Sequence, residues 1–167
     1  STTSHTYSNA GTYTTTLIVT SSVGCSDTTT KVVSVFATPV VNFTDSLTCS
    51  GNLVISNFYD QTVISAPEVL DSWTWDFGGA GGSTLQNPTG IYNNAGTYQI
   101  SLIVKSGNGC TSSASQQLLI PGLPNASFFY NTTPGFNVGA VVNFVDSSSN
   151  AYFNSWNFDD NTDNTST

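Results

Sequence analysis

The stretch GTYQISLIV, residues Gly96–Val104, decides the fold that this sequence predicts. Its aromatic and apolar residues alternate with polar ones, and this period of two places the two sets on opposite faces of an extended strand. The apolar face carries Tyr98, Ile100, Leu102 and Val104, and the polar face carries Thr97, Gln99 and Ser101. A strand with one apolar face is typical of a half-buried sheet. We therefore expect this stretch to cover a hydrophobic core.

A similar stretch occurs 85 residues earlier in the sequence. Tyr92–Cys110 reads YNNAGTYQISLIVKSGNGC, and Tyr7–Cys25 reads YSNAGTYTTTLIVTSSVGC. The core positions of the two stretches match, as do the closing Gly-Cys pairs. A catalytic site is normally built once per domain, so an element repeated in this way indicates length, rigidity or multivalency.

Other segments repeat as well. VISNFYD at residues 54–60 resembles AVVNFVD at residues 140–146, and SWTWDFGG at 72–79 resembles NSWNFDD at 154–160. Trp75 and Trp156 lie 81 residues apart. A unit of about 85 residues with about seven short strands has the size of a small β-sandwich. We expect the tryptophan of each unit to fill the space between its two sheets.

The composition excludes several classes of protein. Only 7% of the 167 residues are charged, the net charge is −8, and the only cations are Lys31 and Lys105. Binding to nucleic acid needs many more basic residues, and so does a polybasic membrane anchor. No apolar run reaches the roughly 18 residues of a spanning helix, so we expect no membrane insertion. Thr, Val, Tyr and Phe in short runs between Gly, Asn and Pro are typical of strands and turns.

WDFGG, followed by IYNNAGTYQISLIV and GC, resembles the polycystic-kidney-disease (PKD) type domain, whose hallmarks are W-D-F-G-D-G and H-x-Y-x-x-x-G-x-Y-x-V-x-L-x-V. HTYSNAGTYTTTLIV, residues 5–19, is similar to the second hallmark, including its His-Thr-Tyr start. The chain departs from the pattern at GGAGG (78–82), Ile91 and Asn157.

The resemblance implies an all-β chain of tandem immunoglobulin-like PKD-type sandwiches, arranged as a beaded array. The C-terminal half of a repeat would occupy residues 1–37, a complete repeat 38–121, and the N-terminal half of another 122–167. Repeats of this kind occur in bacterial secreted or cell-surface adhesins and filament proteins, so the resemblance implies an extracellular or cell-surface location.

The three cysteines suggest one disulfide. Cys25 and Cys110 hold equivalent positions in successive repeats, so they are expected to lie about one domain apart and cannot bond to each other. Cys49 follows the first strand of the complete repeat and Cys110 follows its penultimate strand, and in a sandwich those two ends can lie side by side. We predict a Cys49–Cys110 disulfide, with free buried thiols as the alternative.

Other candidate site residues carry weaker signals. His5, the only histidine, holds the place of a structural histidine in the resembled motif, so we expect no catalytic or metal role for it. Carboxylates at Asp159, Asp160 and Asp163 could hold calcium, but their counterparts in the complete repeat are glycines, which favours a solvated turn and no cofactor. Thr28 and Ser46, in the triplets DTT and DSL, are candidate glycan sites because these triplets resemble an O-glycosylation signal of bacteria that secrete such proteins.

The resemblance leaves two functions open. The first is a structural or adhesive segment of a long extracellular surface protein or filament, in which the Pro-bearing linkers FATPVV (36–41) and IPGLPN (120–125) make a semi-rigid spacer. Its partners would be adjacent repeats of the same protein or identical chains, with a surface polysaccharide or protein as a further ligand. The alternative is an accessory substrate- or carbohydrate-binding module of a secreted hydrolase. We expect no enzymatic activity in either case.

The repeat offsets give Ser1 and Thr167 the same phase of the repeat. We expect the two half repeats to be completed in one of two ways. Either one longer polypeptide supplies the missing halves, or residues 122–167 of one chain supply the strands that residues 1–36 of the next chain lack. The longer polypeptide is favoured because it loses no association entropy.

Overall fold

The computed structural model describes residues 2–131, 139–159 and 163–166. Every regular element in these residues is a β-strand, which confirms the all-β prediction. The described residues contain no helix that is long and apolar enough to cross a membrane. Contacts divide the chain into two compact units, Ser1–Tyr92 with Tyr98–Leu118 and Asn93–Thr97 with Leu119–Thr167.

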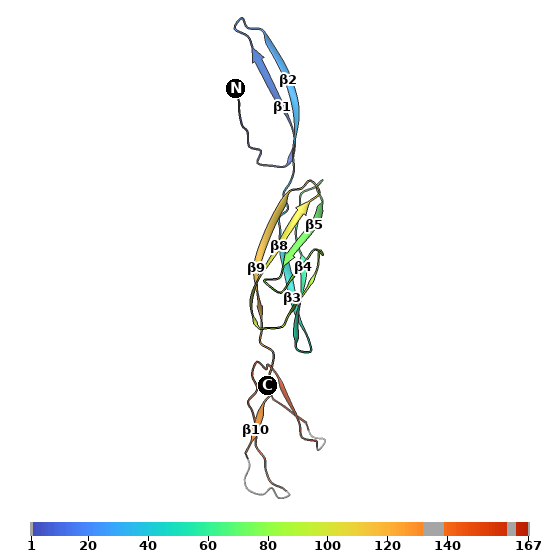
Figure 1. Ribbon diagram of the computed structural model, residues 1–167, viewed down its shortest axis with the longest axis vertical. Helices are drawn as coiled ribbons and strands as arrows, with labels where there is room; N and C mark the ends of the chain where they lie inside the picture. Colours follow the sequence, from blue (N-terminus) through green and yellow to red (C-terminus); the bar gives the residue numbers. More distant parts are fainter. Residues whose placement is uncertain (1, 132–138, 160–162, 167) are drawn as a thin grey trace. The chain divides into compact units, whose positions relative to one another are not determined.

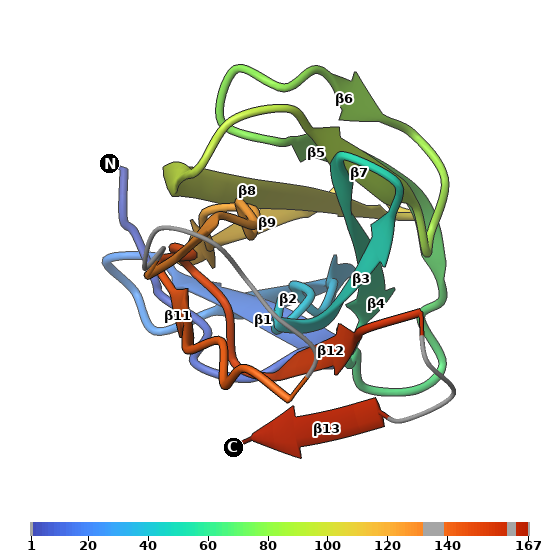
Figure 2. The same cartoon turned by 90° about the horizontal axis from the view of Figure 1, so that it is seen from below.

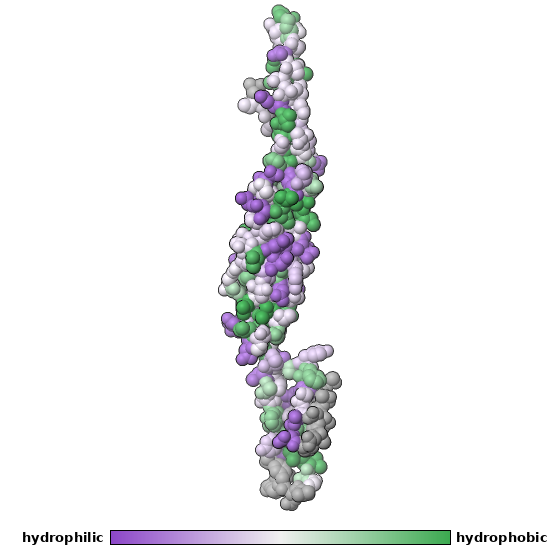
Figure 3. Space-filling model, turned by 90° about the vertical axis from the view of Figure 1, so that its right-hand side faces the viewer, coloured by the Kyte–Doolittle hydropathy of each residue, from purple (hydrophilic) through white to green (hydrophobic). Residues whose placement is uncertain are grey.

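The first two strands form an antiparallel hairpin. β1 (Gly11–Thr20) pairs with β2 (Ser26–Val35) along its whole length, in a register that runs from Gly11 opposite Val35 to Thr20 opposite Ser26. The hairpin carries the alternation of apolar and polar residues, yet its apolar residues are exposed, including Leu17 and Val19. Figure 3 shows apolar side chains at the surface of this segment.

The next seven strands form an immunoglobulin-like β-sandwich of two sheets, called the sandwich below (Figure 1). The first sheet has the order β3-β4-β7, with strands Phe43–Ser50, Leu53–Asp60 and Thr89–Tyr92. The second has the order β6-β5-β8-β9, with strands Gly82–Ser83, Leu70–Asp76, Gly96–Ser106 and Thr111–Ile120. Figure 2 looks along the sandwich and separates β5 and β8 from β3 and β4.

The core of the sandwich lies between these two sheets and is rich in aromatic rings. Trp75 on β5 is only 2% exposed, as the sequence predicts, and its ring centroid lies 5.4 Å from that of Phe58 on β4. β8 contributes Ile100, Leu102 and Val104, which are all fully buried. Tyr98, expected on the same buried face, is only half-buried and packs against Tyr92.

One side chain joins the first and last strands of the sandwich. Gln116 on β9 donates from Nε2 to the Phe43 carbonyl on β3, at 2.9 Å, and to Asn42 Oδ1, at 3.3 Å. β3 and β9 are the first and last strands of the sandwich, so this contact ties its beginning to its end and links the two sheets.

The predicted Cys49–Cys110 disulfide is absent, and both cysteines carry free thiols, as does Cys25. Cys49 is paired with Val54 near the β3–β4 turn, and Val54 also pairs with Tyr92, whose ring contacts Tyr98 at the start of β8. Cys110 instead follows the end of β8. The two cysteines therefore lie at opposite ends of the sandwich, and Figure 1 shows the two turns at its lower and upper ends. The prediction is wrong because it placed these turns at the same end.

The second unit contains two short antiparallel pairs, which repeat the strand pairing of the sandwich. β10 (Phe128–Tyr130) pairs with β11 (Phe144–Asp146), with Phe128 opposite Asp146. β12 (Asn154–Asn157) pairs with β13 (Asp163–Ser166), with Trp156 opposite Asn164. The corresponding pairs in the sandwich are Phe43 with Asp60 and Trp75 with Ser83.

Candidate interaction surface

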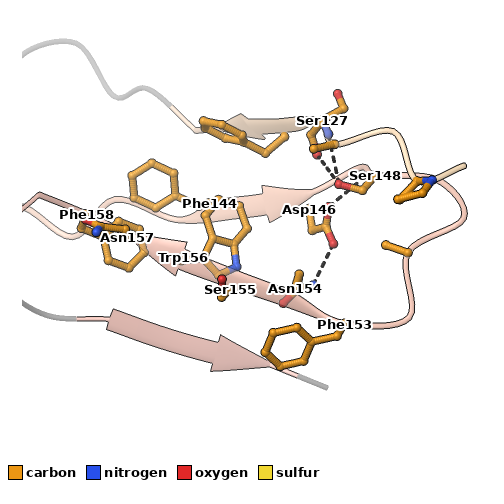
Figure 4. Close-up of a pocket in the computed structure, with 14 residues that line it drawn as sticks. Ser127, Phe144, Asp146, Ser148, Phe153, Asn154, Ser155, Trp156, Asn157 and Phe158 are labelled. Atoms are coloured by element: carbon orange, nitrogen blue, oxygen red, sulfur yellow. Dashed lines mark hydrogen bonds between the residues drawn. The ribbon is translucent and has the colours of Figure 1, made fainter. Parts of the chain in front are cut away.

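An open apolar groove lies in the second unit, with a volume of about 450 Å³ (Figure 4). We call it the aromatic groove, because five aromatic side chains line it: the cluster of Phe128, Phe144, Trp156 and Phe158, together with Phe153. β10, β11 and β12 carry the first three rings, and Phe158 follows β12 directly. The groove also includes small residues such as Ala126, Ser127 and Ala151.

The rings of the aromatic groove have nearly the same centroid separations as the buried rings of the sandwich. The centroids of Phe128 and Trp156 lie 5.3 Å apart at 78°, and those of Phe43 and Trp75 lie 5.0 Å apart at 74°. The Phe144–Phe158 pair and the Phe58–Phe77 pair both have a centroid separation of 5.1 Å, but their interplanar angles differ, at 42° and 7°.

The two clusters differ in exposure. Phe43 is 2% exposed, whereas its counterpart Phe128 is 58% exposed. Trp156 and Phe158 are half-buried, although their counterparts Trp75 and Phe77 are buried. The rings of the aromatic groove are therefore packed like part of the sandwich core, but they remain partly exposed.

A carboxylate at one end of the groove fixes its loops. Asp146 accepts a hydrogen bond from the Ser148 backbone N–H at 2.8 Å and another from Asn154 Nδ2 at 2.8 Å. Hydrogen bonds from Ser148 and from Asn154 lower the pKa of Asp146 below its ordinary value. Figure 4 shows these contacts joining the end of β11 to the start of β12.

Asp60 has the same role in the sandwich. It accepts hydrogen bonds from Trp73 Nε1 at 2.7 Å, from Gln86 Nε2 at 3.1 Å and from the Thr62 backbone N–H at 2.9 Å. Partial burial raises the pKa of Asp60, but the hydrogen bonds from Thr62, Gln86 and Trp73 outweigh burial, so the pKa lies below its ordinary value. We assigned no role to these aspartates from the sequence, although the repeated N-F-x-D motif could have indicated one.

The turn after Trp156 explains part of the acidic cluster. Asp159 has a φ of 59° and corresponds to Gly78, which has a φ of 69°. In both turns the backbone N–H donates to the side chain two residues earlier. Gly78 donates to Asp76 Oδ1, and Asp159 donates to Asn157 Oδ1. Asp159 thus lies in a local turn. The rest of the candidate calcium site, Asp160 and the side chain of Asp163, lies outside the described residues.

The hairpin exposes a second apolar surface. We call it the apolar hairpin face, and it consists of Tyr13, Leu17, Val19 and Val33. Leu17 and Val19 are 58% and 52% exposed, whereas their counterparts Leu102 and Val104 in β8 are fully buried.

The turn that closes the hairpin matches the β8–β9 turn. Cys25 N donates to Ser21 Oγ at 3.1 Å, and Cys110 N donates to Ser106 Oγ at 3.1 Å. The glycine before each cysteine has a positive φ, 89° at Gly24 and 86° at Gly109, which explains the repeated Gly-Cys pair.

The remaining candidate residues lie on exposed strands or chain segments. His5 is exposed, and its ring packs edge-on against Tyr7 at 4.7 Å. Thr28 on β2 and Ser46 on β3 are also exposed, and their glycosylation stays a prediction. Among the residues that the structure describes, no group of three or more His, Cys, Asp or Glu side chains could hold a metal ion.

The family of the chain follows from these features together with a sequence comparison. A family profile described as PKD domain matches residues 36–120, which is just over half of the chain and covers the whole sandwich. The chain belongs to the PKD domain family.

Two solved PKD structures are similar to this PKD chain. The PKD1 domain of Vibrio anguillarum Epp is 28% identical, with 52% of this chain and 96% of that domain covered and a TM-score of 0.43. The PKD1 domain from the Vibrio cholerae metalloprotease PrtV is 29% identical, with 50% and 96% covered and a TM-score of 0.41. No curated protein matches the PKD chain.

Proposed function

We propose that this PKD chain is a non-catalytic repeat segment of an extracellular surface protein or filament, where it acts as a semi-rigid structural spacer. Its partners are other copies of the same repeat, with a surface polysaccharide or protein as a further ligand.

The proposal rests on the structural roles of the repeated residues. Each repeated motif has a packing or turn role. Trp75 and Trp156 belong to the aromatic clusters, and Asp60 and Asp146 fix loops. The Gly-Cys pairs close hairpins. The repeated motifs therefore build the core and the turns of each unit. Repeating such a unit along a chain makes the molecule longer.

The linkers support a semi-rigid arrangement. Val40 pairs with Val63 through two backbone hydrogen bonds of 2.8 and 3.1 Å, and Asn125 pairs with Ser149 in the same way. Only residues 36–39 separate the end of β2 from Val40, and only residues 121–124 separate the end of β9 from Asn125. The first linker contains Pro39, and the second contains two prolines. Proline fixes φ and thereby reduces the freedom of these short segments.

Backbone relaxation of the linker amides tests the proposal. The measurement gives the order parameters of the Ala37 and Gly122 amides. It uses a variant that sedimentation shows to be monomeric, so that association between chains cannot be the cause of rigid linkers. A semi-rigid spacer predicts values near those of the strands, about 0.85. The Gly51–Asn52 turn provides an internal comparison. Values below about 0.6 in both linkers would contradict the spacer role.

A further inference from the structure

We propose that the aromatic groove is a docking site for the β1–β2 hairpin of a second copy of this chain. In this arrangement the apolar hairpin face of one copy covers the rings of the other, and the two together complete one sandwich. The inference deepens one part of the proposed function, the association of repeat copies, but it does not depend on the spacer role, because a monomeric chain could still act as a spacer.

The sandwich provides the template for this docking. Its β8–β9 hairpin is equivalent to β1–β2, and its buried rings are equivalent to those of the groove. In the sandwich, Leu102 on β8 lies beside Trp75 on β5, and both are buried. Their equivalents, Leu17 and Trp156, both have exposed surface in the described structure.

The strand order of the sandwich can be rebuilt from the two parts. The second sheet has the order β6-β5-β8-β9, and β13-β12 and β1-β2 are equivalent to its two halves. In the described residues, β12 pairs only with β13 and β1 only with β2, so each offers an unpaired edge. An unpaired edge is a template for strand addition. The register follows from the sandwich: Leu17 opposite Trp156 replaces Leu102 opposite Trp75.

A polar contact of the sandwich also has its counterpart. Gln116, which donates to the Phe43 carbonyl, corresponds to Lys31 on β2, and Phe43 corresponds to Phe128. Lys31 is paired with Thr15 and lies on the same side of the hairpin as Val33. Its ammonium group is a hydrogen-bond donor and can replace the Gln116 amide. The docked hairpin therefore supplies a donor to the Phe128 carbonyl.

The segment before β1 completes the other sheet. In the sandwich, Tyr92 on β7 pairs with Val54. The equivalent pair in the complex is Tyr7 of one copy and Ala140 of the other. Two positions differ from the template, because Asp159 stands where the sandwich has Gly78 and His5 stands where β7 has Gly90. A Cβ atom at Gly78 would lie 2.9 Å from the Gln99 backbone nitrogen, so the turn at Asp159 must shift to accept Thr14, the counterpart of Gln99. A Cβ atom at Gly90 would lie 3.1 Å from the ring of Phe58, so Phe144, the counterpart of Phe58, must shift to accept His5.

The first test compares two adjacent substitutions in β1. Leu17 and Ile18 are similarly exposed, at 58% and 63%. Their equivalents differ sharply, because Leu102 is fully buried whereas Ile103 stays 46% exposed in the sandwich. Sedimentation equilibrium of the 167-residue chain should give a mass that rises with concentration in steps of 17.6 kDa. Leu17→Asp should weaken association about a hundredfold or more, because docking would bury an unpaired charge, and Ile18→Asp should not.

The groove has its own matched pair. Phe128 and Phe129 are 58% and 53% exposed, but only Phe128 has a buried equivalent, Phe43, because the equivalent of Phe129 is the exposed Thr44. Phe128→Asp should abolish association, and Phe129→Asp should retain it. At Lys31, substitution by glutamine should also retain association because the sandwich has glutamine there, whereas Lys31→Glu should weaken it.

Mixing distinguishes docking from misfolding. The Leu17→Asp chain keeps an intact groove, and the Phe128→Asp chain keeps an intact hairpin. Each should be a monomer alone, and an equimolar mixture should form a 1:1 complex of twice 17.6 kDa that grows no further. The proposal is overturned if the wild-type chain stays monomeric at several hundred micromolar, if both members of a matched pair behave alike, or if the mixture stays monomeric.

Discussion

The contacts of single residues explain which residue types the turns require. Gly78 has a φ of 69°, and a Cβ atom there would lie 2.9 Å from the Gln99 backbone nitrogen, so this turn of the sandwich needs glycine, whereas the equivalent turn of the second unit has Asp159 with a φ of 59°. The sequence indicates a hairpin at this glycine run. It does not indicate the close approach of Gln99, because that contact depends on how β5 and β8 align.

Asp60 is expected to stabilise the folded chain although its side chain is partly exposed. Asp60→Asn removes the charge that accepts hydrogen bonds from Trp73, Gln86 and Thr62, and should lower the free energy of unfolding by about 1–3 kcal/mol at pH 7. The pKa of Asp60 in the folded chain is lowered. Its contribution is therefore fully present above the unfolded pKa of about 3.9 and is lost as the pH falls through the folded pKa.

Urea titrations of the wild type and Asp60→Asn between pH 7 and pH 2 measure this difference. The two free energies of unfolding should converge as the pH falls below about 4. Asp71→Asn, at an exposed position on β5, is the control and should have little effect. A constant difference down to pH 2 would show that charge is not what Asp60 contributes.

Tyr92 has a hydroxyl that its packing does not use. The ring is buried, and the hydroxyl oxygen has no hydrogen-bond partner among the described residues. Burial, together with the charges of Tyr98 and Asp45, raises the pKa of Tyr92 to about 12. Tyr92→Phe should leave the free energy of unfolding unchanged or raise it by up to about 1 kcal/mol at pH 7.

The pH dependence gives a second measurement for Tyr92. The unfolded chain ionises near pH 10, before the folded chain does, so the wild type should lose stability relative to Tyr92→Phe as the pH rises from about 10 to about 12. Chemical denaturation at pH 7 and pH 11 compares the two. A loss of more than 1 kcal/mol at pH 7 would mean that the hydroxyl has a partner.

The thiols can be titrated directly. With dithionitrobenzoate under native, non-reducing conditions, the exposed Cys25 and Cys49 should react before the half-buried Cys110, and three thiols per chain should be found in denaturant. A peptide map that contained linked Cys49 and Cys110 would contradict the structure.

At the scale of elements, alternation along one strand was enough to predict which side chains face inward. Leu102 and Val104 are buried as expected, because period two is a property of the extended backbone itself. The sequence did not reveal which turns share an end of the sandwich. That depends on the direction in which each strand runs, and the error at Cys49 and Cys110 arose there. The sequence also did not indicate the aromatic groove as a surface, because Trp156 is expected in a core.

Equivalent leucines should therefore respond differently to the same substitution. Leu102→Ala should lower the free energy of unfolding of the sandwich by about 2–5 kcal/mol, because it removes fully buried methyl groups. Leu17→Ala should change it by less than about 0.5 kcal/mol, because Leu17 is 58% exposed. Both are measured by urea unfolding in the monomeric Phe128→Asp chain. Equal losses would mean that the hairpin face is already covered.

At the scale of the whole molecule, repetition in the sequence predicted a sandwich of about 85 residues, and the resemblance to the PKD motifs predicted its family. The predicted complete repeat, residues 38–121, lies within two residues of the family match at 36–120. The division into two half repeats stays a prediction.

The contact between Gln116 and Phe43 has a consequence for the time course of folding. Its two residues are 73 positions apart in the sequence. A hairpin such as β3–β4 forms locally within about 1–10 μs, but joining β9 to β3 first requires closing a long loop. Folds dominated by such distant pairings take milliseconds to seconds. During synthesis β3 emerges long before β9, so the contact between Gln116 and Phe43 can form only after the last strand of the sandwich has left the ribosome.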